Sequence, residues 1–303
     1  MKFEVLIVGG GAAGSAAGIN LARANRHVCL IDDGNPRNRF SEHAHGVLGM
    51  DAVNPGELLA KGHREFESFG GTLLHGRVET LHREEGGEWT VALSSGAQIT
   101  ALNVLVATGL TDELPKVPGL SELWGERVFH CPYCHGYEVK GKTVAVVGGE
   151  NPGFTFRVSS LITKWARSVT LYLNGLNLPS DQSRRLRACG VSIVSTPVES
   201  VAAVENDSDG VEIHTMEGRE RFEACFTGPN FTPNDALLRQ AGCAVSDGWV
   251  KVEGGRTSQP GIWAVGNVVS SSDQMSQAAG AGAAIAIAID QDMFDTRISS
   301  LLD

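Results

Sequence analysis

One turn near the start of the chain constrains its fold more than any other feature, and it consists of the residues Gly9-Gly10-Gly11-Ala12-Ala13-Gly14. The turn follows a continuous apolar run from Phe3 to Val8 and precedes a stretch rich in small residues from Ala12 to Ala24. Its first, third and sixth residues fill the pattern G-x-G-x-x-G where a buried strand passes into a helix. Missing side chains allow the backbone to approach a pyrophosphate, and the helix N-terminus supplies free N–H groups and a partial positive charge. The turn therefore predicts a dinucleotide site.

An acidic residue lies at the spacing that such a site requires. A second apolar run extends from Val28 to Ile31 and is followed by Asp32. In βαβ dinucleotide-binding units, a carboxylate about 20 residues beyond the glycines binds the adenosine ribose. We therefore expect Phe3–Val8, Ala12–Ala24 and Val28–Ile31 to form a βαβ unit, with Asp32 on the ribose.

The second half of the chain repeats this plan, which suits 303 residues because a domain has about 150. Each half has a strand, a glycine turn, a helix and a strand, followed by a small antiparallel insert. The fold class is therefore α/β, with two Rossmann-like, doubly wound, three-layer nucleotide-binding domains. The expected elements of the second half are a strand Thr143–Val147, a helix Phe154–Trp165, a strand Val169–Leu173 and a hairpin within Glu199–Phe226. Those completing the first half are a long loop Asp33–Pro55, a hairpin of Glu88–Leu93 with Gln98–Ala101, a separate strand Asn103–Ala107 and a final helix ending near Asp292.

The second glycine turn, Gly148-Gly149-Glu150-Asn151-Pro152-Gly153, is degraded. Glu150 takes the place of the middle glycine, where a carboxylate would crowd and repel a pyrophosphate. The residues after the next strand, Leu173 to Asn177, include no Lys or Arg that could meet a 2′-phosphate. Three arginines on a later short helix are typical of a solvated face. These features argue against NADPH as a tight ligand.

Charge and composition exclude other classes of function. Acidic residues number 35 against 25 basic ones, a net charge of −10 that would be repelled by nucleic acid and by anionic lipid. The longest small-and-apolar stretch, Ala278 to Ile289, is too short and too rich in glycine to span a bilayer. The first residues resemble no signal segment. We therefore expect a cytoplasmic protein that binds neither nucleic acid nor membrane.

The chemistry centres on His130-Cys131-Pro132-Tyr133-Cys134-His135-Gly136. Two cysteines separated by two residues at a helix start can close a small disulfide, and the helix N-terminus lowers a thiol pKa. In a βαβ protein this pair is typical of a redox centre. The alternative is half of a zinc site, but no second cysteine pair completes four ligands, and we expect no metal. The remaining four cysteines occur singly, as buried inert thiols usually do.

Histidines near this pair are candidates for proton transfer. His135 directly follows the second cysteine, where an imidazole could exchange protons with a thiolate. His43 and His45 lie in the long loop of the first half, and the sequence leaves open whether they approach the redox centre.

Together these segments resemble the low-molecular-weight thioredoxin reductase family of flavoproteins, over almost the whole chain. The C-x-x-C run continued by Gly136-Tyr137-Glu138, and the motifs Asp33-Gly34-Asn35-Pro36-Arg37-Asn38 and Gly266-Asn267, are closest to the branch that contains the gliotoxin and holomycin dithiol oxidases. Two departures from NADPH-dependent thioredoxin reductases are that His135 replaces the acid–base Asp and Asn267 replaces the Asp on the flavin ribityl chain.

The resemblance implies a flavin domain from residues 1–114 and 229–303, interrupted by a pyridine-nucleotide-type domain, 115–228, that carries the C-x-x-C. Cys131 would be the outer thiol that exchanges with substrate, Cys134 the inner thiol beside the flavin, and His135 the acid–base. The implied FAD contacts are Gly9, Gly11, Ala12, Ala13, Gly14, Asp32, Asp33, Arg37, Asn38, Val78, Ala107, Thr108, Gly109, Gly266, Asn267 and Gln274. The family also implies a homodimer.

The expected function is that of a FAD-dependent thiol–disulfide oxidoreductase exchanging electrons between flavin and a dithiol or disulfide. One form is a dithiol oxidase of small molecules with oxygen as acceptor. The alternative is a reductase of a thioredoxin-like partner, driven by NADPH or another donor. A zinc- or redox-sensing module, and a flavin enzyme whose cysteines are structural, are further alternatives.

Overall fold

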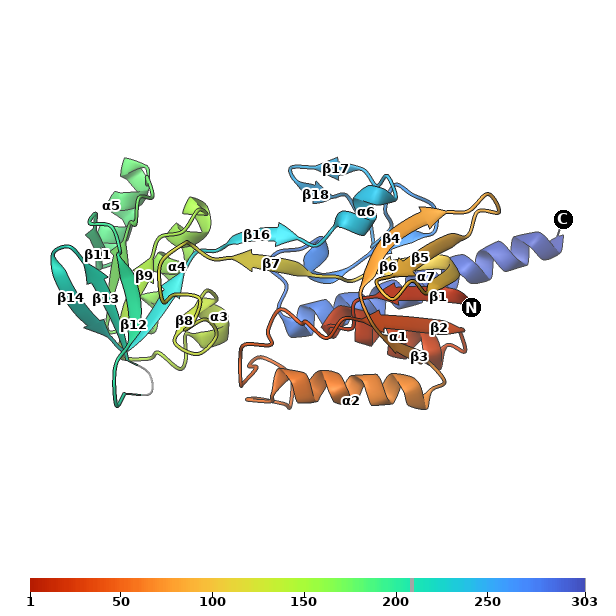
Figure 1. Cartoon of the computed structure of the whole chain (residues 1–303), viewed down its shortest axis with the longest axis horizontal. Helices are drawn as coiled ribbons and strands as arrows, with labels where there is room; N and C mark the ends of the chain where they lie inside the picture. Colours follow the sequence, from red (N-terminus) through yellow and green to blue (C-terminus); the bar gives the residue numbers. More distant parts are fainter. Residues whose placement is uncertain (208–209, 303) are drawn as a thin grey trace. The chain divides into compact units, whose positions relative to one another are not determined.

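A computed structural model of the chain describes residues 1–207 and 210–302 (Figure 1). The chain forms two compact units. The first unit contains Met1–Arg39, Gly46–Thr111 and Pro233–Asp303, and the second contains Phe40–His45 and Asp112–Thr232. The chain passes from the first unit to the second within β7 (Leu110–Glu113) and returns within β16 (Asn230–Pro233). These two strands pair with each other. Phe40–His45, which the resemblance assigns with residues 1–114, clusters with the second unit instead.

The first unit is built on a seven-stranded sheet of order β3-β2-β1-β6-β5-β4, with β19 also paired to β6. β1, β2, β3, β6 and β19 run parallel, while β4 and β5 form antiparallel ladders. Its strands are β1 (Lys2–Val8), β2 (Val28–Asp32), β3 (Thr72–His75), β4 (Val78–Arg83), β5 (Trp89–Leu93), β6 (Gln98–Val106) and β19 (Ile262–Ala264).

Apolar residues on both faces of β1 explain why this sheet is covered twice. Val5 and Ile7 pack with α1 (Ala12–Arg23), α2 (Pro55–Ser68) and α7 (Met275–Leu302). Leu6 and Val8 pack in a separate core with the antiparallel strands and α6 (Ala236–Gln240). The result is the expected layered α/β arrangement. A 3-10 turn η1 (Gly266–Val268) and a short hairpin of β17 (Val245–Ser246) and β18 (Trp249–Val250) complete the unit.

One strand performs two roles that the sequence pattern assigned to separate strands. Gln98–Ala101 and Asn103–Ala107 were expected to be distinct, but β6 runs without a break from Gln98 to Val106. Its first half pairs antiparallel with β5, and its second half pairs parallel with β19. The prediction of two strands is therefore wrong, because the strand continues through Leu102, which is 45% exposed, while its residues change from alternately buried to continuously buried.

The second unit contains a five-stranded parallel sheet of order β11-β10-β9-β15-β8. The strands are β8 (Val128–Phe129), β9 (Thr143–Val147), β10 (Ser168–Tyr172), β11 (Val191–Val194) and β15 (Ala224–Thr227). The helices are α3 (Pro132–His135), α4 (Pro152–Ile162) and α5 (Ser180–Ala188). The predicted βαβ repeat is confirmed by β9, α4 and β10.

Two further predictions need correction. The hairpin expected within Glu199–Phe226 is a three-stranded sheet of β12 (Ser200–Ala203), β13 (Val211–Thr215) and β14 (Gly218–Phe222), and the remaining strand, β15, joins the parallel sheet. The last helix does not end near Asp292 but continues to Leu302. Figure 1 shows this C-terminal part of α7 extending past the strands of the first unit.

Candidate functional site

The first glycine turn is held by tight packing at two of its three glycines. Gly9 has φ +106°, a backbone conformation that residues other than glycine rarely adopt. A Cβ atom on Gly14 would lie within van der Waals overlap of the Gly9 carbonyl oxygen, at 1.9 Å. Both glycines are therefore required by the fold of the turn itself.

Gly11 has no such internal reason to be glycine. A Cβ atom placed on it would meet nothing within 4 Å, and its φ is −69°. Gly11 is also the N-cap of α1, which has no capping side chain and no acidic residue in its first turn. The open space and the uncapped N–H groups fit an anionic phosphate group approaching the backbone, as a dinucleotide requires.

Asp32 lies beside the same turn. Its Oδ1 accepts a hydrogen bond from the N–H of Gly10 at 3.0 Å. The carbonyl of Gly10 accepts from Ser15 Oγ at 2.8 Å and lies 2.9 Å from His63 Nε2. The Gly10 peptide is thus held on both sides. No local sequence pattern identifies His63, because only the fold brings α2 to the turn.

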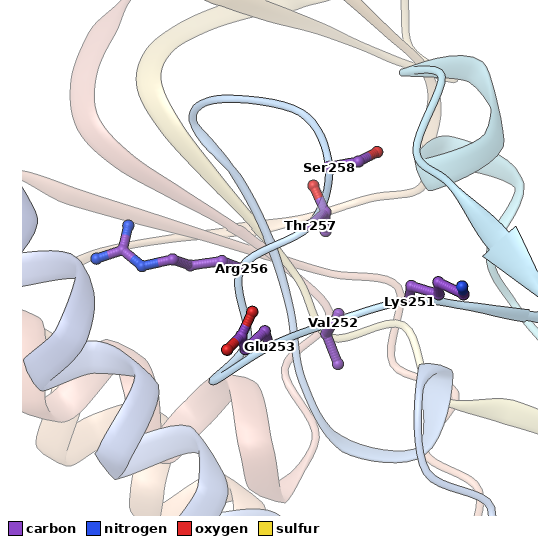
Figure 2. Close-up of a pocket in the computed structure, with 6 residues that line it drawn as sticks. All are labelled: Lys251, Val252, Glu253, Arg256, Thr257 and Ser258. Carbon is purple, nitrogen blue, oxygen red and sulfur yellow. The ribbon is translucent and has the colours of Figure 1, made fainter.

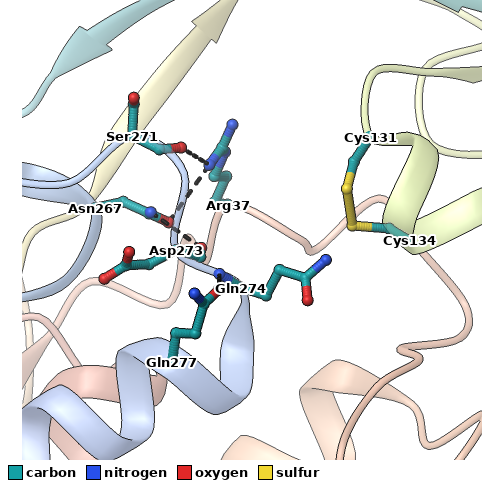
Figure 3. The surroundings of a disulfide bond; sticks show 8 residues. All are labelled: Arg37, Cys131, Cys134, Asn267, Ser271, Asp273, Gln274 and Gln277. Atoms are coloured by element: carbon teal, nitrogen blue, oxygen red, sulfur yellow. Dashed lines mark hydrogen bonds between the residues drawn. A yellow bond between two sulfur atoms is a disulfide. The ribbon is translucent and has the colours of Figure 1, made fainter. Parts of the chain in front are cut away.

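Most other predicted flavin residues occur in two groups in the first unit. Ala107 and Thr108 lie against Gly9, and Gly266 approaches the side chain of Ala13. Arg37 donates to Asn267 Oδ1 at 3.4 Å and to the Ser271 carbonyl at 3.5 Å, as Figure 3 shows.

The amide of Asn267 is already engaged within the chain. Its Nδ2 donates to the carbonyls of Ser270 and Asp273, at 2.7 and 3.1 Å. Asn38 lies in the same region and donates to Met275 Sδ at 3.2 Å. Gln274 directly follows Asp273, just before α7, and its N–H donates to Gln277 Oε1 at 3.0 Å.

The remaining three predicted residues have no hydrogen bond to the glycine turn. Gly109 has φ +69° and begins the turn into β7. Asp33 is exposed and accepts from the N–H of Asn35 at 3.2 Å. Val78 begins β4, two residues after Gly76, whose N–H donates to the Asp32 carbonyl. The role of all these residues toward a flavin stays a prediction.

In the second unit, Cys131 and Cys134 form a disulfide with a Cα–Cα distance of 5.2 Å, drawn in Figure 3. Cys131 is the N-cap of α3, and its carbonyl accepts from the N–H groups of Cys134 and His135, each at 3.1 Å. The predicted pairing at a helix start is therefore confirmed. Gly136 is the C-cap of this helix and donates its N–H to the Pro132 carbonyl at 2.8 Å, and a Cβ atom on it would lie 2.3 Å from that oxygen.

His135 is held as a neutral imidazole. Its ring stacks on Phe129, with centroids 4.2 Å apart, and its Nδ1 is buried without a hydrogen-bond partner among the described residues. Burial, aided by nearby His45, lowers the pKa of His135 to about 4, while the Cys131 carbonyl opposes this shift. At neutral pH, His135 is therefore uncharged, and a thiolate formed beside it would favour its protonated state and oppose the effect of burial.

His45 approaches this region, whereas His43 lies exposed on the same segment. The Nε2 atom of His45 lies 3.5 Å from Oε1 of Glu138, which follows α3. No sequence motif points to a role for Glu138, and its only signal is its position three residues after His135.

The second glycine turn differs from the first in its loop length and in its helix cap. Three residues separate β1 from α1, but four residues, 148–151, separate β9 from α4. Asn151 is therefore the N-cap of α4, and its side chain accepts from the N–H of Phe154 at 3.0 Å. Glu150 is exposed beside it. One N–H group that could bind a phosphate is already occupied, so this end of α4 fits a dinucleotide poorly.

Aromatic side chains gather at this same end of α4. The ring of Phe154 packs edge-on against that of Phe231, with the ring centroids 4.8 Å apart. The ring centroid of His130 lies 6.3 Å from that of Phe154 and 5.3 Å from that of Trp124. Arg184, Arg185 and Arg187 are exposed on α5, as a solvated face would be. Where a basic residue would meet a 2′-phosphate, Asn174 instead donates to the Gly148 carbonyl at 3.2 Å.

Other features of the described residues carry no competing site. A pocket of about 400 Å³ is lined by residues 251–253 and 256–258, none of them predicted site residues (Figure 2). Its Arg256 is engaged by Asp292 at 2.7 Å. In the described part of the chain, no three His, Cys, Asp or Glu side chains are grouped to hold a metal ion.

The four cysteines outside the pair differ in their exposure to solvent. Cys29, Cys225 and Cys243 are buried, and burial raises the pKa of each of these thiols. Cys189, at the end of α5, is exposed, against the expectation of a buried thiol.

Among the described helices, none has the length and apolar character needed to cross a membrane.

Comparison with known proteins agrees with this geometry. The chain matches the pyridine nucleotide-disulphide oxidoreductase family over residues 3–283. It is 32% identical over 187 residues to thioredoxin reductase aclD of Aspergillus oryzae, and the match covers 57% of each chain. A thioredoxin reductase of Gibberella zeae is 26% identical over 92% of this chain and 94% of its own. The chain spans only about half the length of the first curated relatives that it matches.

Solved structures match over nearly the whole chain. The crystal structure of HlmI has a TM-score of 0.94 and 37% identity, covering 99% of this chain and 95% of its own. An oxidoreductase from Agrobacterium tumefaciens has a TM-score of 0.89 and 32% identity, covering 97% and 99%. The expected resemblance to thioredoxin reductase-like proteins, and the two-domain Rossmann class of fold, are confirmed.

Proposed function

Because the chain belongs to the pyridine nucleotide-disulphide oxidoreductase family, we propose that this oxidoreductase is a FAD-dependent thiol–disulfide oxidoreductase that oxidises small dithiols. The observation that carries the proposal is the Cys131–Cys134 disulfide followed by a half-buried, neutral His135. A disulfide accepts two electrons from a dithiol, and an adjacent base can take the thiol protons.

The chain's own residues perform the exchange as follows. A substrate thiol gives its proton to His135 while its sulfur attacks Cys131, and Cys134 leaves as a thiolate. The second substrate thiol then displaces Cys131, so that the substrate disulfide forms and both electrons stay on the cysteine pair.

A flavin, when bound, supplies the two-electron chemistry that returns the cysteine pair to the disulfide, with oxygen as the proposed final acceptor. The open Gly11 and the uncapped α1 would hold its pyrophosphate, and Asp32 its adenosine ribose. Arg37, Asn38, Asn267 and Gln274 would contact the remainder of the cofactor. This assignment follows the family and the fit of the turn.

The different ends of α1 and α4 support a donor other than NADPH. The side chain of Asn151 caps α4, and the ring of Phe154 packs against the ring of Phe231 at this end of the helix. The start of α1, in contrast, has the open Gly11 where a phosphate could approach the backbone. The second candidate function is a reductase of a thioredoxin-like protein, which the names of the relatives favour.

We also propose a cytoplasmic homodimer. A cytoplasmic location fits a chain whose four other cysteines are unpaired. A stripe of exposed apolar side chains follows one face of α7, consisting of Ile287, Phe294, Ile298 and Leu301. Their exposed fractions range from 41% to 71%, and their spacing places them on one side of the helix. Exposed apolar surface of this kind marks a protein interface, and a second copy offers a matching stripe.

An anaerobic experiment tests the function. The purified flavoprotein is mixed with dithiothreitol and, separately, with NADPH, while the visible absorbance of the flavin is followed. We expect bleaching by dithiothreitol and none by NADPH on the same timescale. Rapid bleaching by NADPH would instead favour the thioredoxin reductase alternative.

Two variants connect the result to the disulfide. Cys134→Ser should abolish bleaching by dithiothreitol while FAD remains bound. Cys189→Ser, which changes an exposed cysteine outside the pair, is the matched control and should bleach like the native protein. Normal dithiol turnover by Cys134→Ser would show that the pair is structural.

A further inference from the structure

The carbonyl oxygen of Gly10 is held by side chains from two different helices. Ser15 Oγ of α1 donates to it at 2.8 Å, and Nε2 of His63, on α2, lies 2.9 Å from it. A carbonyl oxygen only accepts hydrogen bonds, so the Nε2 atom of His63 carries the hydrogen and donates. Gly10 and Ser15 are buried and His63 is half-buried, and a hydrogen bond is stronger in such surroundings than in water. Two donors on one oxygen fix the direction of this carbonyl.

The direction of the carbonyl also sets the direction of the N–H of Gly11. Both groups belong to the peptide unit that joins Gly10 to Gly11. This unit is trans, so its C=O and its N–H point in opposite directions within one plane. The N–H of Gly11 therefore points away from the two donors, and it has no hydrogen-bond acceptor among the described residues. It is available to a ligand on the side of the turn that the carbonyl does not face.

The packing of α2 against α1 keeps His63 in place. Phe66, one turn further along α2, is fully buried, and a Cβ atom on Gly18 of α1 would lie 3.2 Å from its ring. Gly62, directly before His63, also approaches α1, because a Cβ atom on it would lie 3.8 Å from Cβ of Ser15. Residues three apart share one face of a helix, so His63 and Phe66 both face α1. The imidazole is thus presented by a buried helix face.

The other side of Gly10 is held by the carboxylate that is expected on the adenosine ribose. The N–H of Gly10 donates to Oδ1 of Asp32 at 3.0 Å. A Cβ atom on Gly10 would lie 2.7 Å from Cγ of Asp32 and 2.9 Å from Nε2 of His63. The two side chains therefore enclose Gly10 and hold the peptide units before and after it.

We propose that His63 is a positioning residue of the FAD site, which holds the Gly10–Gly11 peptide so that the N–H of Gly11 faces the pyrophosphate. The inference rests on the proposed function, which assigns FAD to this turn. A backbone that is ordered before the ligand arrives loses less freedom on binding, and the affinity is correspondingly higher. Without His63, the carbonyl keeps only the hydrogen bond from Ser15, and binding must also order the peptide.

Isothermal titration of the apoprotein with FAD tests this role. His63→Leu removes the donor but keeps a good helix former, and the dissociation constant of FAD should rise about fivefold, as for the loss of one hydrogen bond. His63→Gln should restore most of the native affinity, because its Nε2 is as many bonds from Cα as the Nε2 of histidine and also donates. His82→Leu makes the same change at an exposed histidine of β4 and should bind FAD like the native protein.

A double variant separates positioning from a purely structural role. In Gly11→Ala, the methyl group is expected to keep the phosphate from the backbone, so the direction of the N–H no longer matters. Adding His63→Leu to Gly11→Ala should then change the dissociation constant by less than about twofold, since the two effects are coupled. A structural His63 would instead lower the urea midpoint of the His63→Leu apoprotein and leave its FAD affinity native.

Three results would overturn the positioning role. They are native FAD affinity in His63→Leu, equal losses in His63→Leu and His63→Gln, and an undiminished loss when His63→Leu is added to Gly11→Ala.

Dithiothreitol added anaerobically to the FAD-loaded proteins distinguishes the two proposals. FAD binding that His63→Leu weakens as expected, without bleaching of the native flavin by dithiothreitol, would contradict only the proposed dithiol oxidation. Bleaching together with native FAD affinity in His63→Leu would overturn only the positioning role. A native apoprotein that binds no FAD would contradict both.

Discussion

The side-chain oxygen of Asn151 accepts a hydrogen bond from the backbone N–H of Phe154 at 3.0 Å. This bond closes the N-terminus of α4, whereas Gly11 leaves the corresponding end of α1 open. The two nucleotide-binding motifs of the chain have therefore diverged at the atoms that would contact phosphate.

Replacing Asn151 by Ala should destabilise the protein and leave dithiol oxidation intact. The loss of a helix cap costs about 1 kcal/mol, which urea unfolding should detect. Asn54→Ala is the matched control, because Asn54 caps α2 by accepting from the N–H of Glu57 at 3.1 Å. We expect the two variants to lose similar stability with unchanged flavin content. No loss for Asn151→Ala alone would mean that its bond does not stabilise α4.

Replacing Gly11 by Ala should weaken FAD binding without harming the fold. A Cβ atom there meets no protein atom within 4 Å, so the unfolding midpoint of the apoprotein should be unchanged or slightly raised. The methyl group would occupy the space of a phosphate, and we expect the dissociation constant of FAD to rise about tenfold or more, equivalent to about 1.4 kcal/mol. Isothermal titration of apoprotein with FAD measures it.

The exposed turn residue Gly86, which also has open space around its Cβ position, provides the control for this experiment. Gly86→Ala should bind FAD like the native protein. Equal FAD affinities in the Gly11 and Gly86 variants would contradict a pyrophosphate site at Gly11.

The oxidised protein should lose stability between pH 7 and pH 5 because of His135. Its pKa is lowered to about 4 in the fold, against about 6.5 in an unfolded chain. Between these values the unfolded state binds more protons, so stability falls as the pH falls from about 6.5 towards 4. The contribution is about 2 kcal/mol between pH 7 and pH 5. Urea unfolding at both pH values measures it, and His135→Asn should show a smaller pH dependence. An identical slope in this variant would place the titration elsewhere.

Phe294→Glu should convert the proposed dimer to a monomer. The substitution introduces a charge into the apolar stripe on α7, where a second copy would bury it. Sedimentation at micromolar concentration should show a dimer for the native chain and a monomer for the variant. Ser299→Glu adds the same charge to a different face of the exposed helix end and should remain dimeric. A monomeric native protein would end this proposal.

Local patterns were sufficient for much of the fold. The glycine turn, the apolar runs at Phe3–Val8 and Val28–Ile31, and the two-residue spacing of Cys131 and Cys134 specify their own structure through short-range sterics and chain geometry. Periodicity also identified α1 and α4, with ends shifted by a few residues. It could not show that β6 continues past Leu102, because the partners on its edge, β5 and β19, are far apart in sequence.

The sequence by itself determined the α/β class, an open glycine turn and a cysteine pair beside a histidine, because neighbours in the chain produce these features. Only the tertiary structure decided that Asn151 caps α4, that His63 holds Gly10 and that His45 meets Glu138. The Asn151 cap depends on one extra residue in the loop between β9 and α4, and the spacing of the glycines alone does not show where in the loop that residue is inserted. The other two join residues separated by tens of positions, and such contacts are set by the packing of whole elements rather than by any local pattern.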